Sequence, residues 1–197
     1  MLIISSHHTL GTMDNPTPDE AAGVCTDPMK PGCDSDPRNS EPLHFGRSGE
    51  QPLDQLLLRY PNVVAYVNGH THHNAVSSYT RPKSSKYRSG FWQINTASHV
   101  DWPQQSRTIQ FMDNRDGTLS IFGTILNTAA SVKPPKPGTN ALKMSNSQLA
   151  SLSRQLAAND PQMKATTDGG GPGKKKDRNV ELLLKDPRVL WKAHGNG

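Results

Sequence analysis

The stretch from 60 to 74, which reads YPNVVAYVNGHTHHN, constrains the fold of this chain more than any other feature. Residues 63–67 form a short apolar and largely β-branched run, which is typical of a strand buried on both faces. The run ends near Gly69, where the backbone can turn sharply because glycine has no Cβ, and three histidines follow. Open α/β folds bind ligands at the carboxyl edge of the sheet, so this stretch predicts imidazoles at that edge.

A second strand followed by histidines opens the chain. Residues 2–4 are apolar, and His7 and His8 come shortly after them, so that five of the eight histidines lie in the two places. Two parallel strands joined by a right-handed crossover would bring both clusters to one edge of a sheet. Neutral imidazoles bind divalent transition metals, and His70 and His72 can project to the same side. We therefore favour a metal site over two solvated polar loops.

These residues carry a family resemblance. An apolar strand with His7, and a later strand with Gly69-His70-Thr71-His72, resemble the last two metal-ligand motifs of the calcineurin-like metallophosphoesterases, the second being the G-H-x-H signature. The wider run 2–127 looks like the C-terminal half of a bacterial, actinobacterial branch of that family. The family's D-x-H, G-D-x-x-D and G-N-H motifs are absent from this sequence, so the chain reads as a truncated form.

The resemblance implies an α/β fold, namely part of a metallophosphoesterase-type β-sandwich flanked by helices, with a flexible C-terminal tail. Residues 1–130 would form the C-terminal part of the phosphoesterase domain. They would include a loop-rich insertion at 9–48, which contains many prolines. Outside the resemblance, the composition predicts that residues 131–197 form a linker and tail rich in proline, glycine and lysine. Leu149, Leu152 and Leu156 lie on one side of a short helix predicted near 145–159.

The sequence pattern predicts further elements. Leu53, Leu56 and Leu57 form an apolar stripe on a helix over 51–60. Four runs rich in aromatic and β-branched residues predict antiparallel strands of a second sheet layer, at 76–79, 91–95, 107–112 and 119–125. Residues 180–184 fit either an edge strand or a helical turn.

The resemblance also implies a function, the metal-dependent hydrolysis of a phosphate mono- or diester by a metal-bound hydroxide. The site of the full-length enzyme would hold two divalent metal ions, drawn from Mn, Fe and Zn. The catalytic metal ligands in this chain would be His7, His70 and His72.

Three further histidines are candidates for substrate contacts. His8 directly follows His7, and His73 directly follows His72. An imidazole next to a metal ligand can orient that ligand or donate to a phosphate oxygen. His99 lies in a loop that also contains Asp101 and Trp102. The alternative for His99 is an ordinary packed and hydrogen-bonded side chain.

No motif in the sequence supplies the carboxylate that would hold two cations together. We therefore expect this chain to bind at most one divalent ion, weakly, and to hydrolyse phosphoesters poorly or not at all. The alternative function is a catalytically inactive fragment or partner-binding module that retains a residual histidine metal site. The substrate beyond a phosphoester, the metal and the oligomeric state stay open.

The composition excludes some classes of function. The 22 basic and 17 acidic residues give a net charge of only +5, and no aromatic residue interleaves with the lysine run 174–176, so we do not expect a nucleic-acid partner. Apolar runs fall far short of the ~20 residues that cross a bilayer, so we expect a soluble chain without a membrane span, whose full-length relatives could be exported. Cys25 and Cys33 fit either a disulfide or free thiols.

Overall fold

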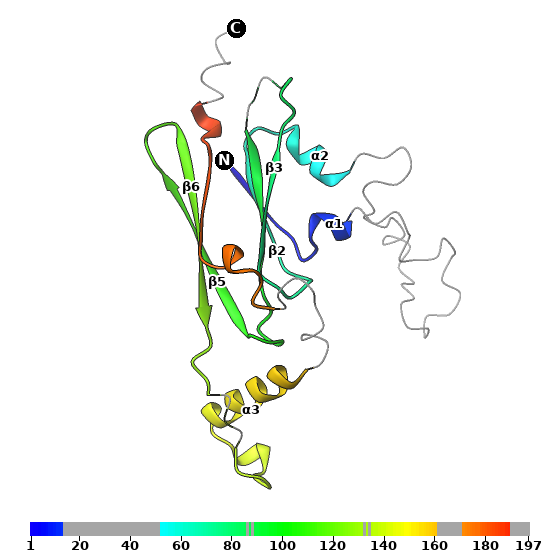
Figure 1. Ribbon diagram of the computed structural model, residues 1–197, viewed down its shortest axis with the longest axis vertical. Helices are drawn as coiled ribbons and strands as arrows, with labels where there is room; N and C mark the ends of the chain where they lie inside the picture. Colours follow the sequence, from blue (N-terminus) through cyan, green and yellow to red (C-terminus); the bar gives the residue numbers. More distant parts are fainter. Residues whose placement is uncertain are drawn as a thin grey trace, which may run out of the picture.

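The computed structural model describes residues 1–13, 52–85, 87, 89–131, 133, 135–160 and 171–189. Their strands form two sheets, one with the order β1-β2-β4-β3 and one with the order β5-β6-β7 (Figure 1). The expected mixed α/β class is therefore confirmed. Cys25, Cys33 and most of the expected insertion at 9–48 lie outside the described residues.

The strand β2 (Val63–Asn68) lies at the centre of the four-stranded sheet. As its apolar run predicts, it is buried along nearly its whole length. It pairs in parallel with β1 (Leu2–Ser5) on one side and with β4 (Gly90–Asn95) on the other. The parallel pairing places the ends of β1 and β2, and the histidines that follow them, at the same edge of the sheet.

The fourth strand, β3 (Ala75–Thr80), pairs antiparallel with β4. The prediction that residues 76–79 and 91–95 belong to the second sheet layer is therefore wrong. In β4, Phe91 packs in one core cluster and Ile94 in the other, so the strand is covered on both faces. A strand with that pattern belongs in a middle layer, which its aromatic and β-branched composition alone does not reveal.

The second sheet consists of β5 (Gln105–Asp113), β6 (Thr118–Asn127) and β7 (Val180–Lys185), all antiparallel. The two predicted strands at 107–112 and 119–125 are thus confirmed. An edge strand, one of the two alternatives for residues 180–184, is confirmed, because β7 lies at the edge of this sheet and Leu182 is buried between the sheets. Residues 180–185 thus belong to the second sheet and not to the expected tail. The indole N–H of Trp92 also donates to the carbonyl of Leu183 at 3.1 Å.

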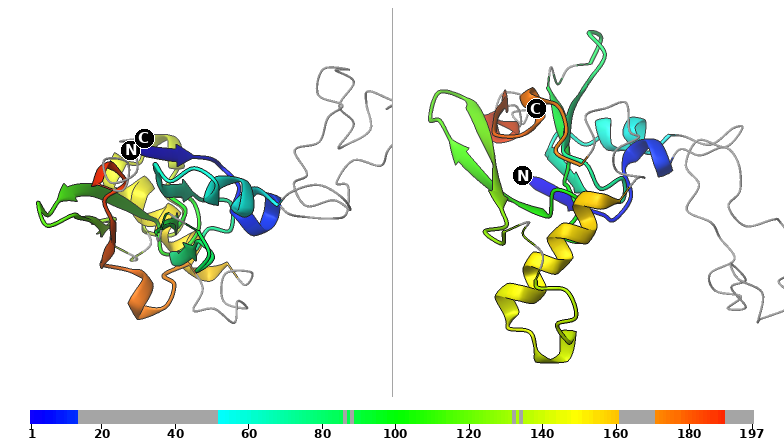
Figure 2. Two further views of the ribbon diagram at one scale, coloured as in Figure 1. Left: turned by 90° about the horizontal axis from the view of Figure 1, so that it is seen from above. Right: turned by 60° about the horizontal axis from the view of Figure 1, so that its bottom comes forward.

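The chain is layered as helices, first sheet and second sheet (Figures 1 and 2). The helices α1 (Leu10–Met13) and α2 (Leu53–Leu58) cover one face of the first sheet. Leu10, Leu53 and Leu57 pack there against side chains of β2 and β4. The opposite face packs on the second sheet through a cluster that includes Val64, Ile94 and Ile121.

The strand β1 differs from β2, because only Ile4 of its apolar side chains is partly buried against the core. It lies at an edge of its sheet, and Leu2 and Ile3 are 44% and 41% exposed. Among the described residues, the backbone of β1 has a strand partner on one side only.

The helix α3 (Asn146–Asn159) confirms the prediction near 145–159. Its N-terminus carries a capping box, in which the Ser145 side chain accepts from the Gln148 amide and the Gln148 side chain accepts from the Ser145 amide. Short 3₁₀ helices lie at Ala141–Lys143 and Lys175–Asp177. No helix in the described part of the chain combines the length and apolarity needed to cross a membrane.

The end of β7 is held to the β5–β6 hairpin by an ion-pair cluster. Arg188 donates from Nη2 to carboxylate oxygens of Asp113 and Asp186, each at 2.7 Å. The Asp186 amide donates to the carbonyl of Gly117 in the hairpin turn at 2.9 Å. The guanidinium of Arg188 lowers the pKa of Asp186 below its ordinary value.

Replacing Ile94 tests the core between the sheets. Ile94 is fully buried, so Ile94→Ala should lower the free energy of unfolding by about 2–5 kcal/mol through lost burial and the cavity left behind. Leu126→Ala, at a half-exposed position of β6, is the control and should change stability much less. Urea denaturation measures both. Equal effects of the two variants would contradict the layer order.

The Arg188 cluster predicts an acid-dependent loss of stability. Because the pKa of Asp186 is lower in the folded than in the unfolded chain, its contribution is full above the ordinary carboxyl pKa of ~4 and is lost as the pH falls through the folded value. Urea midpoints measured across that window should therefore fall more steeply for the wild type than for Arg188→Gln. Lys185→Gln, at an exposed neighbouring position, should keep the wild-type pH dependence.

Candidate metal centre

The two predicted histidine clusters meet at the carboxyl edge of the first sheet. The pairing of β1 with β2 continues beyond the strands, because the Ser6 amide donates to the Val67 carbonyl at 3.0 Å and the Gly69 amide donates to the His7 carbonyl at 3.1 Å. These two bonds fix the segment that carries His7 and His8 beside the loop that carries His70. The juxtaposition follows directly from the register of the two strands.

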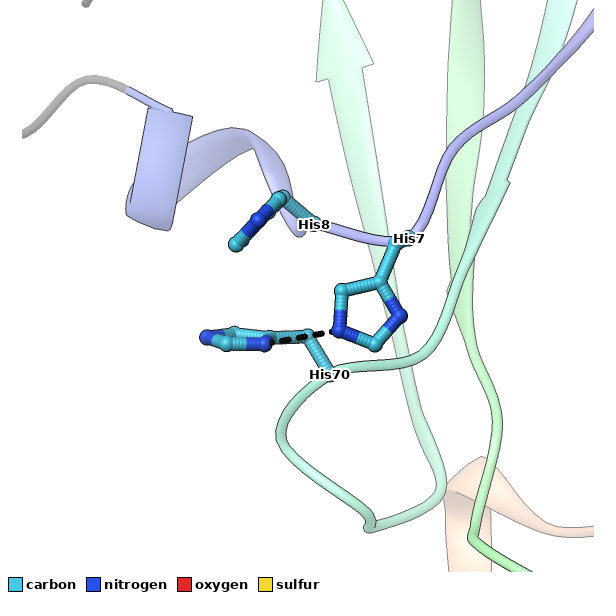
Figure 3. A group of neighbouring side chains, drawn as sticks. All are labelled: His7, His8 and His70. Atoms are coloured by element: carbon cyan, nitrogen blue, oxygen red, sulfur yellow. Dashed lines mark hydrogen bonds between the residues drawn. The ribbon is translucent and has the colours of Figure 1, made fainter. Parts of the chain in front are cut away.

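Three imidazoles form the centre of the site (Figure 3). His70 Nδ1 lies 3.1 Å from His7 Nε2. The ring of His8 lies beside the ring of His70, with 4.3 Å between the centroids and the ring planes tilted by 50°. One ring nitrogen from each of the three histidines lies within 4.8 Å of the other two, and all three residues are exposed. We call these three residues, His7, His8 and His70, the histidine cluster.

The loop after β2 adopts an uncommon backbone. His70 and His72 have φ values of 64° and 55°, in the left-handed region that few non-glycine residues occupy. The Thr71 amide donates to the Gly69 carbonyl at 2.7 Å, which closes a tight turn around His70. Conformations of this kind cost free energy and persist where the surrounding structure holds them, commonly at functional sites.

Two buried asparagines hold this loop. Asn95, at the end of β4, donates from its amide to the Thr71 hydroxyl and, at 2.8 Å, to the His73 carbonyl. Asn74 donates to Gln105 at 2.7 Å and accepts from the Ala97 amide at 3.2 Å, which ties the end of the loop to the segment that leads into β5. The sequence analysis did not identify either residue, although each is a polar residue beside a strand end.

The electrostatics of the cluster favour neutral imidazole at His70. Partial desolvation of the ring lowers the pKa of His70, and the neighbouring rings of His8, His7 and His72 lower it further when they are protonated. A neutral imidazole keeps a lone pair on one nitrogen, which is the form that binds metals.

The other sequence-predicted histidines lie outside this cluster. His72 Nδ1 pairs with the carboxylate of Asp101. His73 Nδ1 donates to the Thr71 carbonyl at 3.2 Å, and His99 Nε2 lies 2.8 Å from the Ser106 hydroxyl. The structure therefore joins His7 with His70 as predicted, adds His8, and directs His72 to a carboxylate.

Asp101 is the residue of the 96–103 loop that reaches the histidines. The residue of that loop predicted from the sequence to contact the substrate was His99. A carboxylate that accepts from Nδ1 of His72 fixes the tautomer of the ring and leaves its Nε2 with a lone pair. No short-range signal joins these residues, because Asp101 lies 29 positions from His72 in the sequence.

The donor set fits one divalent transition metal. Three imidazole nitrogens suit Zn or Fe, and no carboxylate belongs to the group that the described residues bring together. The side-chain amide of Asn68, directly before Gly69, is buried and has no hydrogen-bond partner among the described residues. Its oxygen adds a further polar group close in sequence to the cluster.

Comparisons with known proteins add no assignment. No protein-family model matches the chain, and neither a curated protein nor a solved structure matches it significantly. The residues of the site itself are therefore the basis for assigning its chemistry.

The pairing of His72 with Asp101 predicts the tautomer of the ring. In the neutral ring the proton should reside on Nδ1, because the carboxylate accepts there. In Asp101→Asn the ring loses this charged acceptor, and we expect the Nε2–H tautomer to become populated. Long-range ¹H–¹⁵N spectra of the imidazoles measure the change, with His99, bonded to Ser106, as an internal reference. An unchanged His72 spectrum in Asp101→Asn would show that the pair does not form in solution.

Proposed function

We propose that the histidine cluster binds one divalent transition-metal ion and that the chain is the metal-binding part of a phosphoesterase. The observation that supports metal binding is the convergence of His7 and His70, which leave two parallel strands and bring their ring nitrogens to 3.1 Å. The phosphoester class rests on the resemblance of Gly69-His70-Thr71-His72 to the G-H-x-H motif.

Residues of this chain could take two roles in the proposed reaction, metal binding and proton transfer. A bound divalent cation supplies Lewis acidity toward a phosphoryl oxygen and acidifies water. His7, His8 and His70 would hold the cation, and the bond between Gly69 and the His7 carbonyl keeps the two segments in place. His72, held by Asp101, would present Nε2 either as a further ligand or as a proton acceptor.

One observation favours metal binding without efficient turnover as a second candidate function. Two closely spaced cations normally need a carboxylate between them, and among the described residues the histidine cluster includes none. The nearby carboxylate of Asp101 is engaged by His72. In this second function the chain would be a catalytically inactive module that retains a histidine metal site.

Calorimetry with Zn²⁺ and Mn²⁺ tests the proposed site. We expect one binding event per chain for at least one of the two ions. The affinity should be at least ~10-fold weaker in His70→Ala, because loss of a residue that only hydrogen-bonds to a metal ligand already lowers metal affinity by ~10–100-fold. His99→Ala removes a histidine outside the cluster and should leave the affinity unchanged. Equal binding by the wild type and His70→Ala would refute the site.

Turnover of p-nitrophenyl phosphate and of bis(p-nitrophenyl) phosphate by the metal-loaded chain separates the two functions. Hydrolysis that His70→Ala abolishes supports a phosphoesterase. Metal binding with no hydrolysis of either ester supports the inactive module.

A further inference from the structure

A second feature adjoins the pair of Asp101 and His72. It is an apolar groove between α3 and the loop that precedes β5. The groove has a volume of about 420 Å³, within the ~300–1,000 Å³ of small-molecule sites. Its walls are mostly aliphatic side chains, and two aspartates also line it. The aliphatic residues include Val100, Leu149, Leu152 and Leu156, and the aspartates are Asp101 and Asp160.

The leucines of α3 face this groove instead of a packed core. Leu149 and Leu156 are 40% and 64% exposed, and Val100 across the groove is 75% exposed. An amphipathic helix normally buries its apolar stripe. Three large aliphatic side chains line the same groove and are exposed to solvent. An apolar ligand that buried them would bind favourably through the hydrophobic effect.

Polar contacts hold α3 in this position. The side chain of Gln104 donates to the Ser153 hydroxyl at 2.9 Å, and Arg154 donates to the Pro103 carbonyl at 3.0 Å. The guanidinium of Arg154 also lies over the ring of Trp102, 4.7 Å from its centroid. The helix is therefore attached to the loop beside the groove without using its leucines, and the groove stays open.

Asp101 connects the groove to the candidate metal centre. It lines the groove, and its carboxylate pairs with His72, two positions from His70 of the histidine cluster. A ligand in the groove therefore contacts the residue that holds His72. The negative charges of Asp101 and Asp160 disfavour an anionic group inside the groove, whereas a cation held by the histidines would attract one.

We infer that the groove binds the apolar group of the substrate, so that the phosphoester carries an alkyl chain. The phosphate would lie at the histidine cluster, and the chain would lie between Leu156 and Val100. This inference rests on the proposed function, because it assigns the phosphate to the metal centre. It narrows the substrate class from phosphoesters in general to amphiphilic ones.

Binding of two phosphonates tests the inference, since their carbon–phosphorus bond resists hydrolysis. Decylphosphonate and methylphosphonate share the anionic group and differ in the alkyl chain. With the Zn²⁺-loaded chain, calorimetry should give a decyl-to-methyl affinity ratio of at least ~10, the scale on which apolar pockets discriminate small groups. Leu156→Ser should lower this ratio about 10-fold. Leu142→Ser changes a leucine that is 95% exposed and outside the groove, and should keep the wild-type ratio.

The outcomes separate this inference from the proposed function. If neither Zn²⁺ nor Mn²⁺ binds, or if methylphosphonate does not bind the metal-loaded chain, the proposed function is refuted and the inference with it. If methylphosphonate binds but the ratio is near one, or Leu156→Ser leaves a high ratio unchanged, only the groove assignment is refuted. If sedimentation shows a dimer that Leu156→Ser dissociates, the groove is an interface between copies of this chain, which also refutes the assignment.

Discussion

The site depends on the parallel pairing of β1 with β2. The hydrogen bonds of this pairing run past the last strand residues, from Ser6 to Val67 and from Gly69 to His7. Because parallel strands end at the same edge of a sheet, the segments after them lie side by side. A shift of one residue in this register would turn the alternate side chains to the other face and would separate His7 from His70.

The rest of the fold keeps that pairing in place. β2 lies between two layers, with α1 and α2 on one face and the second sheet on the other. Asn95 and Asn74 then restrain the loop beyond β2 by hydrogen bonds to the loop backbone and to the segment that leads into β5. The left-handed backbone at His70 and His72 is therefore supported from several sides, as a strained loop requires.

Much of the local structure could be predicted from the sequence. The apolar run at 63–67 identified a strand buried on both faces, and the spacing of the leucines identified α2 and α3. The sheet in which each later strand lies could not be predicted, because β propensity reports a half-buried strand and not its partner. The local pattern at 180–184 predicted either an edge strand or a helical turn, and the pairing with β6 that decides for the strand is a long-range contact.

The candidate site also has parts that the sequence predicts and parts that it does not. The strand-then-histidine pattern was enough to predict that His7 and His70 converge. It was not enough to predict the direction of His72, because its partner Asp101 comes from a loop after β4. Nor could it reveal the groove on α3, since a leucine stripe in a sequence reads as core until the structure shows it exposed.

The exposed position of β1 has a consequence for the dynamics of the site. A strand with one neighbour and little buried apolar surface belongs to the least stable part of a fold and opens locally more often than the strands beside it. Each opening of β1 would carry His7 and His8 away from His70. A cation that bridges the two segments would oppose this fraying, so that slower amide exchange in β1 would accompany occupancy of the centre.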